Sequence, residues 1–308
     1  MKQLSVHLTD LCNSKCSFCV VASPMHVSDS VQYPEVVRFL ESHAGRGYEA
    51  VNLHGGEPTV HPKFFETLAL IKRLGYPEIH VQTNGLLLSR KDFARRSVEG
   101  GVSLFVVSLH AADPKVQDGI TRTAGGFAKT LQGIRNVKAL GARVRTNTVV
   151  TKQTAPMLTR IVRLACGLDV DHINISNLHP VGSSAFSLDR TLPRLQDIAR
   201  IVEDSGALAL AEKKRLTVEG FPFCALPGLV RHQLSLERRR ITMLIRGQVI
   251  SDYDGFMSDR MRSFGTPCQS CGCRKECGGV YPGYLRSHGW EEFSAIGRTA
   301  ICGPASSV

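Results

Sequence analysis

The sequence lacks any long apolar segment. None of the hydrophobic stretches in this 308-residue chain approaches the roughly 20 residues needed to cross a bilayer. The first ten residues, MKQLSVHLTD, also lack the apolar core and the small-residue cleavage site of a secretion signal. These two absences exclude the integral membrane classes, and we expect a cytoplasmic protein with no membrane partner.

Aromatic residues are few, at 6% of the chain, and they are missing where positive charge is densest. The run LERRRITMLIRG (236–247) contains no aromatic side chain on which bases could stack, which disfavours binding of single-stranded nucleic acid. The formal net charge of +11 still favours anionic partners such as phosphates or carboxylates. The alternative is charge spread over solvated helix faces, and this basic run could be one such face.

Ten cysteines are too few for a disulfide scaffold, and they are too clustered for random core positions. One group lies near the start of the chain and a second group lies near its end, and such clusters in a reducing compartment bind metal or perform redox chemistry. The first group is Cys12, Cys16 and Cys19, the second is Cys268, Cys271, Cys273 and Cys277, and the isolated cysteines are Cys166, Cys224 and Cys302.

Short segments rich in Val and Ile alternate with amphipathic helical patterns along the first two thirds of the chain. The predicted strands cover residues 4–9, 48–54, 78–84, 102–110, 142–151 and 171–178. Helices between successive strands return the chain to the same end of the sheet, so the strands should run parallel with right-handed crossovers. We find no internal repeat and no low-complexity segment.

The length of this alternation predicts an open barrel. A closed eight-stranded barrel takes roughly 250 residues, whereas the alternation here ends near residue 205 after six units. We therefore expect an α/β fold with a partial (β/α)6 TIM-like barrel over residues 1–210 and a small carboxy-terminal region over 211–308. In such folds the functional residues collect where strands end, and the first cysteine group directly follows the first strand.

The first cysteine group provides three ligands where a structural zinc site needs four, and no histidine stands at a suitable distance to complete it. An iron–sulfur cubane has four irons, so three thiolates leave one iron open to bind a molecule that is then transformed. The spacing Cys-x3-Cys-x2-Cys, with Phe18 before the last cysteine, resembles the signature of the radical S-adenosylmethionine superfamily.

The resemblance extends over roughly residues 4–182 and implies further cofactor contacts. GGEP at 55–58 is similar to the family motif that contacts the amino group of the methionyl moiety, and TNG at 83–85 ends the third strand. The stretch VSLH resembles the family segment that contacts ribose, and RVRTNTVVT matches its fifth strand. The implied cofactor-binding residues are Gly55, Gly56, Glu57, Asn84, Ser108 and Asn147. Alternatively, Glu57 starts a helix, and the small polar residues only terminate strands.

The second cysteine group resembles the auxiliary-cluster region of SPASM and twitch enzymes. This resemblance implies a second 4Fe-4S cluster held by Cys268, Cys271, Cys277 and Cys224. Cys273 or Cys302 could instead supply a ligand, and Cys224 could be a catalytic thiol that donates a hydrogen atom to a product radical. A zinc ribbon is the alternative reading, and we expect Cys166 to be a buried apolar residue.

The resemblance implies an enzyme that reductively cleaves S-adenosylmethionine, so that a deoxyadenosyl radical abstracts hydrogen from a substrate. We expect a peptide or a small biosynthetic intermediate as substrate, with a flavodoxin or ferredoxin as electron donor. Because the first strand begins near residue 4, without an amino-terminal peptide-binding domain, a separate partner would have to deliver a peptide.

Two other classes of function stay open. The substrate could be a nucleotide, a nucleotide sugar or RNA, or the protein could be a non-catalytic iron–sulfur carrier or sensor. Arg122, Arg143 and Arg145 could bind a substrate carboxylate or phosphate, with solvated surface charge as the equal alternative. Three histidines at strand ends are expected mainly to pack or to form hydrogen bonds: His54, His110 and His179.

Overall fold

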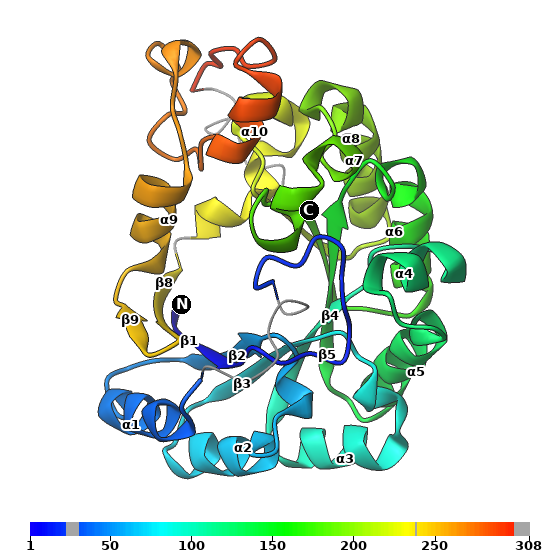
Figure 1. Cartoon of the computed structure of the whole chain (residues 1–308), viewed down its shortest axis with the longest axis vertical. Helices are drawn as coiled ribbons and strands as arrows, with labels where there is room; N and C mark the ends of the chain where they lie inside the picture. Colours follow the sequence, from blue (N-terminus) through cyan, green and yellow to red (C-terminus); the bar gives the residue numbers. More distant parts are fainter. Residues whose placement is uncertain (23–30, 238, 299–308) are drawn as a thin grey trace.

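A computed structural model describes residues 1–22, 31–237 and 239–298 and contains a strongly curved sheet with helices on its outer face (Figure 1). The strand order of this sheet is β7-β6-β5-β4-β3-β2-β1-β8-β9. The strands are β1 (Lys2–Thr9), β2 (Ala50–Gly55), β3 (Glu78–Thr83), β4 (Val102–Ser108), β5 (Arg143–Val150), β6 (His172–Asn177), β7 (Arg215–Glu219), β8 (Arg240–Ile245) and β9 (Gln248–Ile250). All neighbours pair in parallel except β8 and β9.

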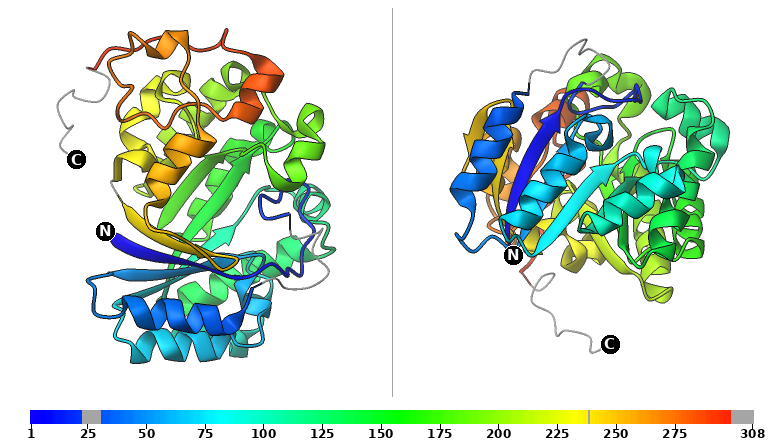
Figure 2. Two further views of the ribbon diagram at one scale, coloured as in Figure 1. Left: turned by 60° about the vertical axis from the view of Figure 1, so that its left-hand side comes forward. Right: turned by 90° about the horizontal axis from the view of Figure 1, so that it is seen from below.

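The helices surround the sheet from outside, as the two further views in Figure 2 show. They are α1 (Tyr33–His43), α2 (Phe64–Arg73), α3 (Lys91–Glu99), α4 (Pro114–Thr121), α5 (Gly126–Ala139), α6 (Leu158–Gly167), α7 (Leu188–Thr191), α8 (Leu195–Ala211), α9 (Tyr253–Met261) and α10 (Pro282–His288). Short 3-10 helices include η2 (Pro58–Val60), η5 (Gly182–Phe186), η6 (Phe223–Ala225) and η8 (Leu234–Glu237). In the described ranges, no helix combines the length and the apolar character that a membrane span requires.

The predicted α/β class and the open parallel barrel are confirmed. Each of the six expected strands is present, and the sheet stays open because β7 and β9 occupy opposite edges without pairing to each other. A further short strand, β7, continues the parallel sheet beyond the sixth unit.

One expectation about the basic run 236–247 is wrong. This run contains β8, in which Ile241–Leu244 are buried, and β8 pairs with β1 from Lys2↔Arg240 to Val6↔Leu244. Arg240 at the start of the strand and Arg246 after its end are exposed, so the run is a strand with charged ends and not a solvated face. The carboxy-terminal third of the chain therefore completes the sheet on the far side of β1.

Both faces of β1 are buried, but they differ in chemistry. Leu4, Val6 and Leu8 belong to the apolar core shared with the helices, whereas the alternate residues are polar. These alternate residues, which point into the barrel, are Gln3, Ser5, His7 and Thr9, and Asn52 of β2 donates to Ser5 Oγ (3.3 Å). A closed barrel fills this space with branched apolar side chains. A polar interior here is suited to binding polar ligands.

Candidate active site

The cysteine-bearing segment follows β1 and is fixed by backbone hydrogen bonds from distant elements. The amides of Lys15 and Ser17 donate to Thr121 O (2.9 Å) and Ile120 O (3.0 Å) at the end of α4. From the loop after β6, the amide of Ser183 donates to Cys19 O (2.8 Å). The segment is therefore held above the carboxyl ends of the strands from two sides.

A cavity of about 970 Å³, including its open mouth, lies beneath this segment. All nine residues predicted to bind the first cluster or S-adenosylmethionine line it: Cys12, Cys16, Cys19, Gly55, Gly56, Glu57, Asn84, Ser108 and Asn147. In the part of the chain that the structure describes, no three His, Cys, Asp or Glu side chains are grouped tightly enough to hold a single metal ion. The structure thus brings the predicted residues together, and their roles stay predictions.

Burial makes the free thiols of this cavity weak acids. It raises the pKa of Cys12 to about 12, and the charge of Glu57 acts in the same direction. Burial raises the pKa of Cys16 to about 12 as well, with the charges of Cys12 and Cys19 adding to the effect. Such thiols keep their protons until a metal neutralises the thiolate charge. The donor set therefore fits an iron–sulfur cluster, whose binding would release these protons.

Glu57 is buried in the wall of the cavity, and its carboxylate ties two elements together. Its Oε1 accepts from the Thr59 hydroxyl (2.6 Å) and amide (3.2 Å) and from the Thr83 hydroxyl (2.7 Å). Its Oε2 accepts from the amide of Asn84 (2.6 Å). Glu57 also caps η2, which agrees with the alternative that this residue starts a helix. Oε1 is saturated by these bonds, whereas Oε2 keeps a lone pair for a ligand.

The glycines after β2 allow two backbone segments to pass closely. A Cβ on Gly56 would lie 2.2 Å from Leu11 O and 2.6 Å from Asp10 O, at the start of the cysteine segment. Gly55 adopts φ +135°, and a Cβ there would lie 2.3 Å from Thr9 O. The two glycines thus lie against the end of β1 and the start of the cysteine segment. The amide of Glu57 donates to Leu11 O (2.9 Å) in the same place.

Asn84 connects the end of β3 to the cysteine segment. Its Nδ2 donates to Asn13 Oδ1 (2.7 Å) and approaches Cys12 Sγ at 3.9 Å. Ser108 and Asn147 are register partners on β4 and β5, and both face the cavity. Asn147 Oδ1 accepts from Asn174 Nδ2 (2.6 Å), which fixes the orientation of the amide.

The predicted histidines pack against other rings, and His110 Nδ1 also accepts from the amide of Val149 (3.3 Å). His110 meets the ring of Phe18 edge-on at 5.0 Å, and burial lowers its pKa to about 4, so it is neutral at neutral pH. His54 meets the His7 ring edge-on at 5.5 Å, and burial also lowers its pKa, to about 3. His179 stacks on Tyr281, with ring centroids 4.2 Å apart.

The three candidate anion-binding arginines are in different environments. Arg122 is exposed in the left-handed cap of α4, and Arg143 is half exposed and pairs with Glu78 (2.7 Å). Arg145 alone points into the barrel, where its side chain is 14% exposed.

Asp10 and Arg246 were missed by sequence reasoning although they border the cysteine segment. Asp10 is fully buried, and its Oδ1 lies 2.7 Å from Arg246 Nη2 and 2.9 Å from His7 Nε2. Arg246 also donates to Val21 O (3.3 Å). Arg246 comes from the β8–β9 turn, so no local pattern around the cysteines could have identified it.

A second cavity of about 380 Å³ contains the predicted auxiliary cysteines. Cys224, Cys268, Cys271 and Cys277 line it together with apolar side chains that include Phe223, Phe264 and Phe293. Burial raises the pKa of Cys224 to about 11, and the charges of Cys277 and Cys268 contribute. Cys224 is outside the lining of the larger cavity.

The other two candidate ligands are not seen in this cavity. Cys273 is buried in a separate small cluster, and its Sγ lies 3.4 Å from Gly297 O. Cys302 lies outside the described residues. Cys166 packs against the main core from α6, as expected for an apolar residue, but it is half-buried and not fully buried as predicted.

Comparison with known proteins agrees with this geometry. The sequence profile of the Radical SAM superfamily matches residues 6–165. A probable GTP 3',8-cyclase of Sulfolobus acidocaldarius is 29% identical over 265 residues, which cover 82% of this chain and 84% of the relative. A protein of the same name from Saccharolobus islandicus is 30% identical over 269 residues, covering 82% and 85%.

Solved structures show the same fold. The crystal structure of Streptococcus suis SuiB bound to S-adenosylmethionine superposes with a TM-score of 0.70 at 18% identity, covering 96% of this chain and 76% of SuiB. The superfamily implies a 4Fe-4S cluster and S-adenosylmethionine, and the thiols and polar strand ends around the larger cavity fit both groups. The chain is an enzyme that belongs to the radical S-adenosylmethionine superfamily.

Proposed function

We propose that this radical S-adenosylmethionine enzyme acts on a nucleotide of the class of GTP. The observation that carries the proposal is the similarity to relatives named probable GTP 3',8-cyclase, which extends over 82% of the chain. The polar barrel interior and the net charge of +11 support an anionic, hydrogen-bonding substrate.

This proposal corrects the expectation of a peptide or small biosynthetic intermediate, and of a partner that delivers a peptide. The relatives that overturn it are named for a nucleotide substrate. The nucleotide alternative, which the sequence left open, takes its place. The fold shared with SuiB does not bear on this choice, because at 18% identity it concerns architecture alone.

In this proposal Cys12, Cys16 and Cys19 hold the first 4Fe-4S cluster. When bound, the cluster and S-adenosylmethionine would supply the radical chemistry that starts the reaction on the substrate. Glu57 would balance the ammonium of S-adenosylmethionine through Oε2, and Ser108 and Asn147 would bind its nucleoside part. The closely packed backbone at Gly55 and Gly56 shapes the wall, and the enclosing strands exclude water from the reacting atoms.

We further propose a second, SPASM- or twitch-like 4Fe-4S cluster in the carboxy-terminal region, 211–308, whose strands β7, β8 and β9 continue the sheet of the radical S-adenosylmethionine barrel proposed for 1–210. The shared cavity of Cys224, Cys268, Cys271 and Cys277 supports this ligand set, and its aromatic lining resembles the protected surroundings of such clusters. The same placement favours Cys224 as a cluster ligand over Cys224 as a hydrogen-atom donor to substrate.

The test is release of deoxyadenosine by the anaerobically purified, reduced enzyme in the presence of GTP, ATP, CTP or UTP. We expect one purine nucleotide to accelerate release and to be consumed. Replacing Cys12, Cys16 and Cys19 by alanine should abolish release, whereas replacing Cys268 and Cys271 should leave cleavage uncoupled from nucleotide. If no nucleotide binds or accelerates cleavage, the substrate assignment is wrong.

Iron analysis tests the second cluster independently of substrate. We expect about eight irons per chain, because two cubanes hold four irons each. The double variant C268A/C271A should retain about four irons, and Cys166→Ala, which removes a cysteine outside both cavities, should retain the full amount. A content of four irons with one zinc would instead indicate a zinc ribbon.

A further inference from the structure

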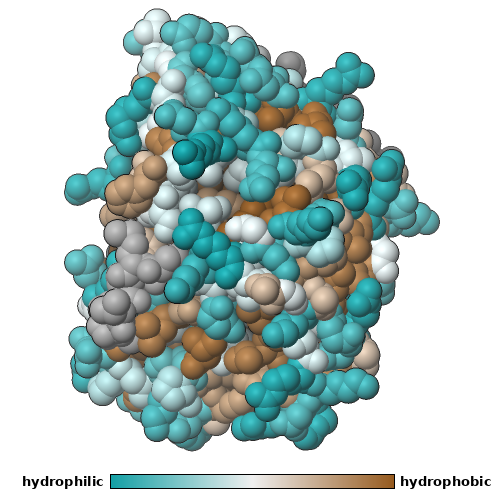
Figure 3. Space-filling model, turned by 45° about the vertical axis from the view of Figure 1, so that its right-hand side comes forward, coloured by the Kyte–Doolittle hydropathy of each residue, from teal (hydrophilic) through white to brown (hydrophobic). Residues whose placement is uncertain are grey.

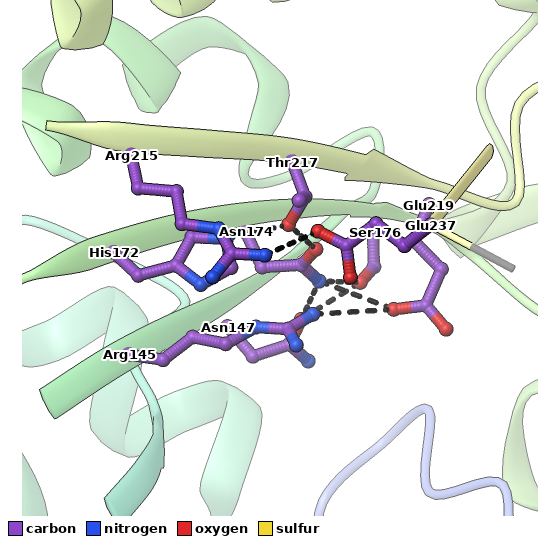
Figure 4. A network of polar contacts seen from close by, with 9 residues as sticks. All are labelled: Arg145, Asn147, His172, Asn174, Ser176, Arg215, Thr217, Glu219 and Glu237. Carbon is purple, nitrogen blue, oxygen red and sulfur yellow. Dashed lines mark hydrogen bonds and ion pairs between the residues drawn. The ribbon is translucent and has the colours of Figure 1, made fainter. Parts of the chain in front are cut away.

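A polar network joins β5, β6 and β7 inside the barrel, and it includes Glu219, the last residue of β7 (Figure 4). Asn147 of β5 lines the larger cavity. Asn174 of β6 donates through its Nδ2 both to Asn147 Oδ1 (2.6 Å) and to Glu219 Oε2 (3.2 Å). A single amide group therefore links the Glu219 carboxylate to the wall of the cavity, at the strand ends where parallel barrels collect their functional residues.

Only one oxygen of the Glu219 carboxylate is occupied by the protein. Its contacts with Asn174 and Arg145 both reach Oε2, as the dashed lines in Figure 4 show. Oε1 has no hydrogen-bond partner among the described residues, although an ionised carboxylate offers about four acceptor positions. The Glu219 side chain is 47% exposed, whereas Asn174, which orients it, is fully buried. Glu219 thus presents a fixed acceptor that is open to a ligand.

The contact between Glu219 and Arg145 is too long for a carboxylate whose role is a structural ion pair. Glu219 Oε2 lies 3.8 Å from Arg145 Nη2. Elsewhere in the same network, Glu237 Oε1 of η8 lies 2.6 Å from Arg215 Nη2. Charge-assisted hydrogen bonds between these groups are ordinarily about 2.7–2.9 Å long. The carboxylate of Glu237 is therefore committed to its arginine, whereas that of Glu219 retains its capacity for other donors.

The residues that orient Glu219 are themselves held by hydrogen bonds on two strands. Asn174 Oδ1 accepts from Thr217 Oγ1 (2.6 Å), and Thr217 Oγ1 lies 2.8 Å from His172 Nε2. These bonds fix which end of the Asn174 amide faces Glu219, so that Nδ2 donates to the carboxylate. A binding group that is fixed before the ligand arrives loses little conformational freedom on binding, which favours specific recognition.

We propose that Glu219 binds the base of the substrate and selects guanine over the other bases. The inference rests on the proposed function, which supplies the nucleotide. Guanine carries two adjacent donors, N1–H and the N2 amino group, and they match the two acceptor oxygens of a carboxylate. Adenine has an acceptor, N1, between its donors, and uracil has a single N–H donor between two carbonyl groups. Either base would leave the carboxylate without one of its hydrogen bonds, which is the basis of strong discrimination.

The test measures binding of GTP, inosine triphosphate and ATP to the iron-loaded enzyme by calorimetry, with S-adenosylmethionine present and no reductant. Inosine triphosphate lacks only the N2 amino group of GTP. Because the three probes share their triphosphate, the ratios of their dissociation constants report on the base. We expect the wild type to bind GTP about tenfold more tightly than inosine triphosphate, and ATP most weakly. Glu219→Gln offers one acceptor oxygen, so its constants for GTP and inosine triphosphate should agree within about twofold.

Glu237→Gln is the matched control, because it removes a carboxylate of the same network that is already paired with Arg215. Its ratios should equal those of the wild type. Glu219→Asp is a second variant, which keeps both oxygens but withdraws them, and it should weaken GTP several-fold without affecting ATP. Equal binding of the three probes by the wild type, or equal weakening of all three in Glu219→Gln, would overturn the inference and leave the proposed function standing. If the wild type binds none of them, the proposed function fails and this inference fails with it.

Discussion

Arg246 in the β8–β9 turn contacts Asp10, which lies 236 residues earlier in the chain, through Nε (2.8 Å) and Nη2 (2.7 Å). The same side chain reaches Val21 O, so it contacts the cysteine segment on both sides of its three thiols. Asp10 is fully buried, and a buried carboxylate that loses its cation is strongly destabilised. The turn therefore positions the thiols from outside the barrel.

We expect Arg246→Gln to loosen the cysteine segment and to lower the iron retained after reconstitution. The remaining contact of Asp10 with His7 should keep the barrel folded, so the cost in the free energy of unfolding should be about 1–3 kcal/mol. Iron content after gel filtration and the rate of cluster loss to a chelator measure the effect. Arg240→Gln, on the exposed first residue of β8, should retain iron like the wild type. Equal retention in both variants would contradict the positioning role.

Gly56→Ala should be strongly destabilising, because the new Cβ would lie 2.2 Å from Leu11 O, a backbone atom that cannot rotate away. We expect a loss of about 2–3 kcal/mol or more in the free energy of unfolding, typical of overpacking, together with weaker cluster retention. Gly119→Ala in α4 is the matched control, since nothing lies within 4 Å of its Cβ position. That control should keep or slightly raise stability, because alanine favours helix. Denaturant unfolding curves decide between these outcomes.

The barrel should lose stability on acidification. Burial, followed by the positive charges of Arg145, Arg215 and Arg239, lowers the pKa of His172 to about 3. The unfolded chain binds a proton near pH 6.5 whereas the folded chain stays neutral, so stability present above pH 6.5 falls as the pH drops towards 3.

For His172 alone this loss amounts to roughly 2 kcal/mol between pH 7 and pH 5, at about 1.36 kcal/mol per unit below the unfolded pKa. His172→Gln keeps a group able to bond Thr217 but cannot take up the proton, so its unfolding free energy should fall less over this range. Unfolding curves at the two pH values measure the difference. An identical loss in both proteins would show that His172 does not contribute.

Tyr281 connects the carboxy-terminal region to the barrel. Its ring stacks on His179, which follows β6, and the Arg262 guanidinium lies 3.5 Å from its other face. We expect Tyr281→Ala to accelerate amide hydrogen exchange in α10 and around the second cavity while leaving α1 unaffected. Tyr281→Phe keeps the stack and should exchange like the wild type. Faster exchange throughout the molecule would instead indicate a general loss of stability.

The sequence was sufficient for much of the fold because its strands are separated by clear helical patterns. It failed at β8, where Arg240 and Arg246 flank Ile241–Leu244 and the charge concealed the apolar core of the strand. Pairing of β8 with β1 depends on contacts between residues more than 230 positions apart, such as Lys2↔Arg240, which no local pattern encodes.

At the site, spacing predicted which residues share the cavity, but it did not predict their bonds. Glu57 is expected to balance an ammonium, and that role stays a prediction, but the spacing gave no sign that three of its four hydrogen bonds saturate Oε1 from Thr59 and Thr83. Arg145 and Arg143 are equivalent in the sequence, two residues apart on one strand. Only the sheet register, which places Arg145 beside His172 in the interior, distinguishes the buried arginine from the exposed one.

Figure 3 shows one face of the molecule, on which hydrophilic side chains surround smaller groups of apolar side chains. The pairing of β1 with both β2 and β8 has a consequence for biosynthesis. As the nascent chain leaves the ribosome, β1 has one open edge until residue 245 has emerged. A chain truncated after residue 210 would retain that open edge permanently, and open edges of this kind recruit strands from other molecules. A chaperone that shields β1 during synthesis would therefore protect the protein from aggregation, and the isolated barrel segment would form inclusion bodies.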